Sequence, residues 1–216
     1  PGWPVWTDLL DEVDPLSDQH HLDSEAFDGA VDPQAGGALL TAAAVADLDG
    51  DGTLEVVMTS LRGRVHVYDA EGVARPGFPQ GVDPELSRPE ETSSSRVIDR
   101  GFGSSPALGD LDGGGDLEIV AGGMDGHIYA WHDDGSAVDG WPVALAYEGP
   151  DQAPVARIVG TPALGDIDGD GLDDVVVGTN ESVSQFYGLA YAVHGDGNDH
   201  PGGAYMAGWP VTLFGA

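Results

Sequence analysis

The residues most suited to chemistry are acids that recur in three short loops rich in glycine. Each loop follows the pattern D-x-D-G-[DG]-G-x-x-[DE]. Calcium takes about six to eight oxygen ligands, and alternating acids on a tight turn can converge on one ion. The pattern therefore predicts three calcium sites, with glycine at positions 4 and 6 allowing the turn. The predicted site residues are Asp47, Asp49, Asp51, Thr53 (carbonyl) and Glu55 in loop 1; Asp110, Asp112, Gly114, Asp116 (carbonyl) and Glu118 in loop 2; and Asp166, Asp168, Asp170, Leu172 (carbonyl) and Asp174 in loop 3.

Loop 2 departs from the pattern at its fifth position, where Gly114 replaces an aspartate. It has one carboxylate fewer, so we expect it to bind calcium most weakly. An EF-hand needs an acid at position 12, and the three loops have Met58, Ala121 and Val177 there. The alternative is an acidic turn without metal, which three copies at equivalent positions argue against. Magnesium fits less well because it prefers rigid octahedral sites that keep water ligands.

The loops lie inside three internal repeats, which we expect to be blades at 41–79, 105–143 and 161–211. Each repeat reads as four short strands, A to D, separated by glycine turns, with the acidic loop between A and B. Four-stranded antiparallel units in tandem predict an all-β fold of β-propeller blades. Residues 1–5 repeat the Gly-Trp-Pro-Val segment that ends a repeat, so they predict an extra N-terminal strand, the outer strand of a preceding blade.

The blades are separated by long connections: an acidic loop at 6–40, loops at 80–104 and 144–160, and an insertion near 179–187 within blade 3. Propellers have about four to eight blades. The chain is therefore expected to be part of a larger ring, completed by blades of the same longer chain or by another copy.

Two further sets of residues recur between repeats. Trp3, Phe78, Trp141 and Trp209 each precede proline, and we interpret them as packing residues between blades rather than sugar platforms. His132 and His194 share one strand C position, where the first repeat has Asp69; this recurrence favours a structural role. A separate group, His20 and His21 near Asp18 and Asp23, is a weaker candidate for a transition metal.

The composition narrows the classes of partner. The 216 residues carry 38 acids, seven arginines and no lysine, for a net charge of −31. Such a charge disfavours nucleic acid and anionic membrane surfaces, and no apolar run is long enough to insert into a membrane. The absence of cysteine excludes disulfides and thiolate metal sites. The three loops contain only some of the 38 acidic residues. Two explanations remain open for the other acidic residues: adaptation to high salt, or a compositional bias combined with selection for solubility.

The acidic loops and their flanking segments, such as SPALGDLDGGGDLEIVAGG and TPALGDIDGDGLDDVVVGT, resemble FG-GAP/VCBS repeats of integrin-α-like propellers, in the form found in secreted bacterial proteins. Phe102-Gly103 resembles the FG element. The resemblance implies calcium in the A–B loops, and ligand binding by the D–A and B–C loops at the opposite end.

These features predict a calcium-stabilised extracellular or cell-surface propeller segment that serves adhesion or protein recognition, with a structural role for the metal. The alternatives are a carbohydrate-binding propeller and a non-catalytic accessory domain of a secreted hydrolase or lyase. The expected ligand is a protein or a glycan. We expect no enzymatic activity, because the sequence contains no Gly-x-Ser-x-Gly, HExxH or P-loop motif.

Overall fold

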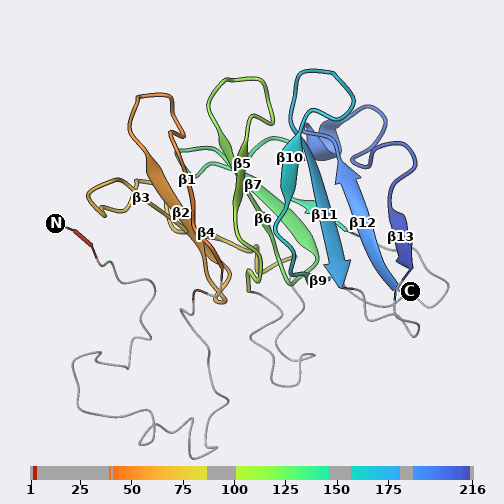
Figure 1. The fold of residues 1–216 in the computed structure, drawn as a ribbon, viewed down its shortest axis with the longest axis horizontal. Helices are drawn as coiled ribbons and strands as arrows, with labels where there is room; N and C mark the ends of the chain where they lie inside the picture. The colour runs from red at the N-terminus through yellow and green to blue at the C-terminus, as the bar shows by residue number, and fades with distance from the viewer. Residues whose placement is uncertain are drawn as a thin grey trace, which may run out of the picture.

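The computed structural model describes residues 2–3, 39, 41–86, 101–145, 157–180 and 187–214. In these ranges the regular elements are short strands and one 3-10 helix, η4 (Gly197–Asp199), joined by turns and loops. The strands form three antiparallel sheets that stand side by side in chain order (Figure 1). The predicted all-β fold of propeller blades is confirmed.

Each sheet contains a meander of four strands joined in sequence order, and sheet 3 has a fifth strand. Sheet 1 contains β1 (Ala44–Ala46), β2 (Glu55–Thr59), β3 (Arg64–Tyr68) and β4 (Gln80–Gly81). Sheet 2 contains β5 (Ala107–Gly109), β6 (Glu118–Gly122), β7 (His127–Trp131) and β8 (Val143–Ala144). Sheet 3 contains β10 (Ala163–Gly165), β11 (Asp174–Asn180), β12 (Tyr187–Val193) and β13 (Val211–Phe214), with β9 (Arg157–Ile158) added on β11.

The last strand of each sheet begins later than the aromatic-proline segment that was expected to form it. The strands β4, β8 and β13 start directly after Pro79, Pro142 and Pro210. Proline has no N–H to donate to a sheet, so regular pairing begins only after it. The predicted loop 144–160 differs as well, because its last described part contains β9.

Burial along the strands shows how the sheets pack. In β2, buried and half-buried residues alternate, as expected for a sheet covered on one face. In β6 of the middle sheet every residue is buried. Two apolar clusters explain the difference: Ile119 of β6 packs with Val57 and Val67 of sheet 1, while Val120 packs with Val175 and Tyr191 of sheet 3. The core therefore lies between neighbouring sheets.

Phe102, in the segment that resembles the FG element, helps to join sheets 1 and 2. Its side chain is fully buried and meets the rings of Tyr129 and Trp131 edge-on at 5.9 and 6.1 Å between centroids. Its backbone N–H donates to the Ser60 carbonyl of sheet 1 at 3.0 Å. Phe102 therefore contributes both apolar packing and a backbone hydrogen bond to this junction.

A second kind of contact between neighbouring sheets recurs along the row of sheets and uses the Gly-aromatic-Pro segments. The Trp141 indole N–H donates to the Gly195 carbonyl in the strand C to D hairpin of sheet 3, at 2.9 Å. The Trp3 indole makes the equivalent bond to the Ala70 carbonyl of sheet 1, at 3.1 Å. At both positions the preceding glycine lies directly against a hairpin carbonyl. The predicted packing role is visible at Trp141, which is buried in the apolar cluster shared by sheets 2 and 3, whereas Trp3 is 44% exposed and meets the Tyr68 ring edge-on.

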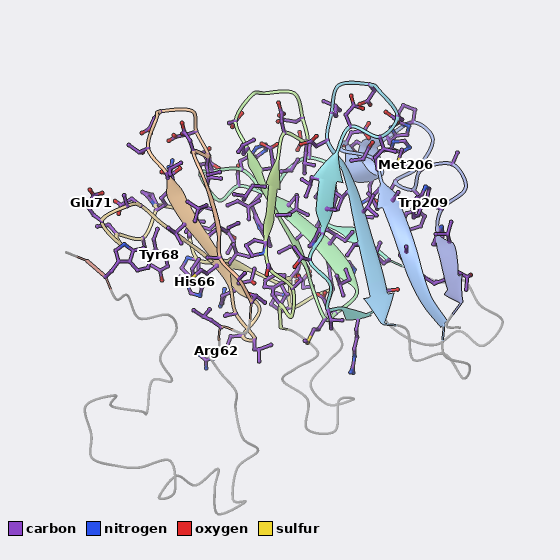
Figure 2. All side chains as sticks on the ribbon, viewed as in Figure 1. Arg62, His66, Tyr68, Glu71, Met206 and Trp209 are labelled. Atoms are coloured by element: carbon purple, nitrogen blue, oxygen red, sulfur yellow. The ribbon has the colours of Figure 1, made fainter. Side chains whose placement is uncertain are left out.

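The fourth copy of this segment lies on the outer side of sheet 3. A Cβ placed on Gly208 would meet no heavy atom of the described residues within 4 Å. Figure 2 shows Trp209 at this end of the array and Tyr68 at the other. The Gly208-Trp209-Pro210 segment of sheet 3 therefore has no hairpin against Gly208 among the described residues, unlike the equivalent segment of sheet 2.

Several predicted features lie mostly outside the described residues. They are the N-terminal strand beyond Gly2 and Trp3, most of the acidic loop 6–40 with its histidines, and residues 181–186 of the insertion expected near 179–187, whose ends belong to β11 and β12. None of the described helical structure is long and apolar enough to span a membrane.

Candidate metal centre

The three acidic loops are the connections between the first and second strands of each sheet. They lie at the same end of the three sheets, the upper end in Figure 1. In each hairpin the last loop acid pairs with the final residue of the first strand: Glu55 with Ala46, Glu118 with Gly109, and Asp174 with Gly165. The same register therefore places the ninth loop position identically in all three sheets.

Glycine at loop positions 4 and 6 has a positive φ in every copy, as the tight turn requires. The φ angles are 71° and 91° in loop 1, 78° and 89° in loop 2, and 84° and 97° in loop 3. Other L-residues rarely adopt this conformation. The turn directs backbone N–H groups inward, where the first aspartate accepts them: Asp47 Oδ2 from Gly52 at 2.9 Å, and Asp166 Oδ2 from Gly171 at 3.1 Å.

The last acid of each loop is buried and held by the backbone. Glu55, Glu118 and Asp174 are at most 2% exposed. One oxygen of each carboxylate accepts the N–H of the second loop residue, at 3.0, 2.7 and 2.8 Å. The second oxygen differs between the loops: Glu55 Oε1 lies 3.2 Å from Arg75 Nη1, Glu118 Oε1 lies 3.3 Å from His132 Nδ1, and Asp174 Oδ1 has no hydrogen-bond partner among the described residues.

The structure brings many of the predicted ligands together. Ligand atoms within 4.8 Å of one another occur in four clusters: Asp47, Asp49 and Glu55; Asp166, Asp168 and Asp170; Asp112, Glu118 and His132; and Asp168, Asp174 and His194. Asp51 and Asp110 lie outside these clusters. Asp51 Oδ1 instead accepts the Thr53 N–H and hydroxyl, at 2.7 and 2.6 Å. Gly114 contributes only its N–H, which donates to Asp112 Oδ1 at 2.7 Å.

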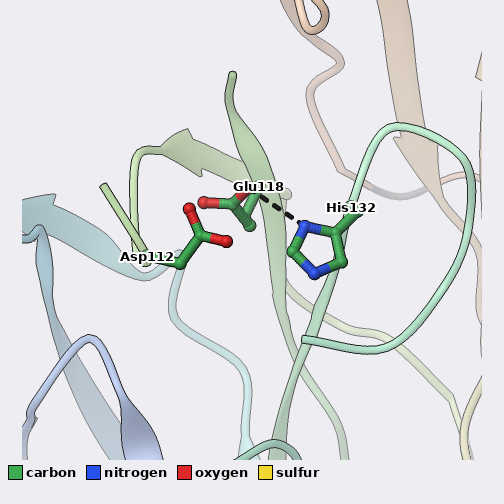
Figure 3. Close-up of side chains that lie close together, drawn as sticks. All are labelled: Asp112, Glu118 and His132. Atoms are coloured by element: carbon green, nitrogen blue, oxygen red, sulfur yellow. Dashed lines mark hydrogen bonds and ion pairs between the residues drawn. The ribbon is translucent and has the colours of Figure 1, made fainter. Parts of the chain in front are cut away.

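The two strand C histidines belong to this centre, which the sequence did not predict. His132 Nδ1 lies 3.3 Å from Glu118 Oε1, and the dashed line in Figure 3 marks this contact. His194 Nδ1 lies 3.3 Å from Asp168 Oδ2 and 3.7 Å from Asp174 Oδ1. The sequence feature that could have identified these histidines was their recurrence at one position of the repeat, just before the Asp-Gly hairpin. Only the packing of strand C beside the loop shows what that position faces.

Loop 1 has Asp69 at the position of these histidines, and an arginine from further along the chain contacts its acids. The Arg75 guanidinium contacts Asp49 and Glu55 of the loop and Asp133 of sheet 2. This residue was also missed in the sequence, because it lies far along the chain from the acids it meets.

The electrostatics of the centre fit a bound cation. Burial raises the pKa of Glu118 and of Asp174, and the nearby acids Asp112 and Asp168 add to the effect. Asp174 Oδ1 is buried and has no hydrogen-bond partner among the described residues, and the same holds for Asp47 Oδ1. A buried carboxylate oxygen without a partner is costly. A metal ion in the loop would provide that partner, and the all-oxygen set of the loop acids suits calcium.

Neighbouring loops are also connected. The Leu117 N–H of loop 2 donates to the Leu48 carbonyl of loop 1, and the Asp173 N–H of loop 3 donates to the Asp110 carbonyl of loop 2, both at 2.8 Å. An ion that orders one loop would therefore also order the edge of the next.

Comparison with known proteins supports the repeat assignment. The FG-GAP repeat matches residues 159–193, so the predicted resemblance is confirmed in the third repeat. None of the curated protein sequences matches the chain. A solved structure described as BBS1N in complex with ARL6DN, soaked with lead, is similar over 81% of this chain, with 15% identity and a TM-score of 0.44. The present chain spans 45% of that chain.

Proposed function

We propose that this chain, whose residues 159–193 are an FG-GAP repeat, is a calcium-stabilised segment of an extracellular β-propeller that serves adhesion or protein recognition. The observation that carries the calcium assignment is the buried Asp174 carboxylate, whose Oδ1 faces its loop without a hydrogen-bond partner among the described residues. A calcium ion held by the loop acids would neutralise this group. The metal role is structural, because the loop connects two strands of the scaffold.

The form of the loops supports an extracellular setting. Asp49, Asp168 and Asp170 are exposed, so an ion bound there keeps access to solvent. Extracellular calcium modules typically bind with dissociation constants of about 10⁻⁴ to 10⁻³ M, and partly exposed loops of this kind suit that range.

The recognition surface is proposed at the end of the sheets opposite the acidic loops. The D–A and B–C connections lie there, and rigid scaffolds commonly carry binding residues on such loops. The proposal rests on the described ends of these connections, because residues 87–100, 146–156 and 181–186 lie outside the described part of the chain. The ligand is a protein or a glycan. Binding of the calcium-loaded chain to a glycan array would favour the carbohydrate alternative over protein recognition.

Further blades are also proposed as partners, from the same longer chain or from another copy. The contact that joins sheet 2 to sheet 3 uses Gly140 and Trp141 against a hairpin. Sheet 3 presents the equivalent Gly208 and Trp209 with no hairpin against Gly208 among the described residues. A following blade with a similar hairpin would fit this segment.

Thermal unfolding with and without chelator tests the calcium assignment. Saturation at about 100 times the dissociation constant stabilises a protein by about 2.7 kcal/mol per site. For a chain of this size, each kcal/mol corresponds to roughly 2–4 °C in Tm. We therefore expect chelation to lower Tm by roughly 5–11 °C for each occupied site and added calcium to restore it.

Asp168→Asn should reduce this calcium response, since it removes one loop carboxylate. Asp139→Asn is the matched control, because it removes one exposed charge outside the loops and should leave the response intact. A Tm that does not change on chelation would contradict the proposed role.

A further inference from the structure

The position that Arg75 occupies is shared by all three sheets. After strand C the chain folds back, and one residue donates its backbone N–H to a carbonyl of that strand. These pairs are Arg75 with Val67, Val138 with Ala130, and Met206 with Ala192, at 2.9, 3.2 and 3.0 Å. Only sheet 1 has a charged residue here. Val138 and Met206 are buried and apolar.

The Arg75 guanidinium lies against two acids of loop 1. Its Nη2 is 2.7 Å from Asp49 Oδ2, and its Nη1 is 3.2 Å from Glu55 Oε1. Hydrogen bonding from Arg75 also lowers the pKa of the Asp49 carboxyl. The guanidinium therefore stabilises the charged form of Asp49.

The remaining oxygens of the same two acids are also occupied. Asp49 Oδ1 accepts the Asp51 N–H at 3.2 Å, and Glu55 Oε2 accepts the Leu48 N–H at 3.0 Å. Both oxygens of both carboxylates therefore have a partner without any metal, and Asp47 Oδ1 is the one buried acid oxygen of loop 1 without a hydrogen-bond partner among the described residues. In loop 3 the equivalent of Glu55 is Asp174, whose Oδ1 has no hydrogen-bond partner among the described residues.

Arg75 also reaches the neighbouring sheet. Its Nη2 lies 2.9 Å from Asp133 Oδ2, in the strand C to D hairpin of sheet 2. The guanidinium is thus fixed between three carboxylates, and its side chain is only 20% exposed. This geometry holds the positive charge at loop 1 instead of leaving it free to move into solvent.

We propose that Arg75 is a built-in cation that takes the place of calcium in loop 1, so that calcium binds loops 2 and 3 and binds loop 1 at least tenfold more weakly. The inference rests on the proposed calcium role of the loops. An ion entering loop 1 must displace the guanidinium from Asp49 and Glu55 or bind close to a like charge. Loop 1, with its full set of acids, then becomes the weakest site, below the Gly114 loop that the sequence ranked last.

The test counts the calcium ions bound by the whole chain, by equilibrium dialysis after removal of metal. We expect two ions on the wild-type chain. Arg75→Met, which introduces the residue of sheet 3, should raise the count to three. Arg75→Gln removes the charge while keeping hydrogen-bond donors, so it gives the same reading if the methionine variant folds poorly.

Three further variants assign the change to loop 1. Asp47→Asn added to Arg75→Met should abolish the third ion. Asp133→Asn breaks the contact with sheet 2 but leaves Arg75 on loop 1, so its count should stay at two. Val138→Arg places the charge beside loop 2 and should lower the count to one.

Two results would overturn the inference while leaving the calcium role intact: three ions of similar affinity on the wild-type chain, or two ions on both Arg75 variants. Absence of calcium from every variant would overturn the calcium role itself, and the inference with it.

Discussion

The contact between Gly140 of sheet 2 and the hairpin of sheet 3 can be tested with an internal control. Gly140 and Gly208 occupy the same place in two Gly-Trp-Pro segments, with φ angles of 80° and 92°. Alanine at either position meets the same backbone penalty, about 1–2 kcal/mol for a left-handed residue. Their surroundings differ, because only Gly140 has a neighbouring sheet against it.

The extra cost at Gly140 follows from that neighbour. A Cβ there would overlap the Asp196 carbonyl oxygen and lie 3.2 Å from both the Asp196 carbonyl carbon and the Asp199 nitrogen. These are backbone atoms, so the sheets must separate slightly to admit the methyl group. Overpacking of this kind typically costs about 1–3 kcal/mol. Gly140→Ala should therefore be less stable than Gly208→Ala by about 1–3 kcal/mol.

The assay is chemical or thermal unfolding of the two variants and the wild-type chain, in calcium and at a concentration where light scattering reports a monomer. At roughly 2–4 °C per kcal/mol, the two variants should differ by several degrees in Tm. Equal losses of stability would refute the packing of sheet 2 against the sheet 3 hairpin. A larger loss at Gly208 would refute it as well.

Two other predictions use the same sheets. Trp141→Phe leaves the Gly195 carbonyl without its indole donor and should lower the free energy of unfolding, measured with denaturant, by about 1–3 kcal/mol. Trp209→Phe, on the outer side of sheet 3, should change it by less than about 0.5 kcal/mol. Equal effects of the two variants would contradict the role of Trp141 in joining sheets 2 and 3. Burial raises the folded-state pKa of Asp174, so its charged form destabilises the metal-free fold, and that cost disappears as the pH falls through the raised pKa. Without calcium, Asp174→Asn should therefore have a higher Tm than the wild-type chain at pH 7, a difference that closes toward pH 4. With saturating calcium the order should reverse, and a variant less stable than wild type at pH 7 in both conditions would contradict this reasoning.

The sequence predicted the features that depend on short stretches of chain. Each acidic loop spans one hairpin, so the spacing of its acids and glycines defines the turn in which Asp47 accepts the Gly52 N–H. The repeats predicted three similar sheets for the same reason. The strand C to D hairpins were also recognisable from their Asp-Gly and Glu-Gly pairs.

The contacts that the sequence did not predict join distant residues. Arg75 is 26 residues from Asp49 and 58 from Asp133, and no local pattern links them. His194 faces Asp168 only because strand C packs beside the loop. The strands β4, β8 and β13 begin after the aromatic-proline segment because the proline has no N–H to donate to the sheet. This is a property of one residue, and the repeat pattern used to predict the strands does not contain it.

The complete burial of β6 has a consequence for how repeats can be gained or lost. Each apolar cluster is shared between two adjacent sheets, and the middle sheet contributes to both. Stability in such an array grows approximately with the number of neighbour contacts, as in a one-dimensional chain of coupled units. Removal of a terminal sheet breaks one junction, whereas removal of the middle sheet breaks two and requires a new one. Duplication or loss of whole repeats at the ends is therefore the least disruptive route by which this architecture can change its size.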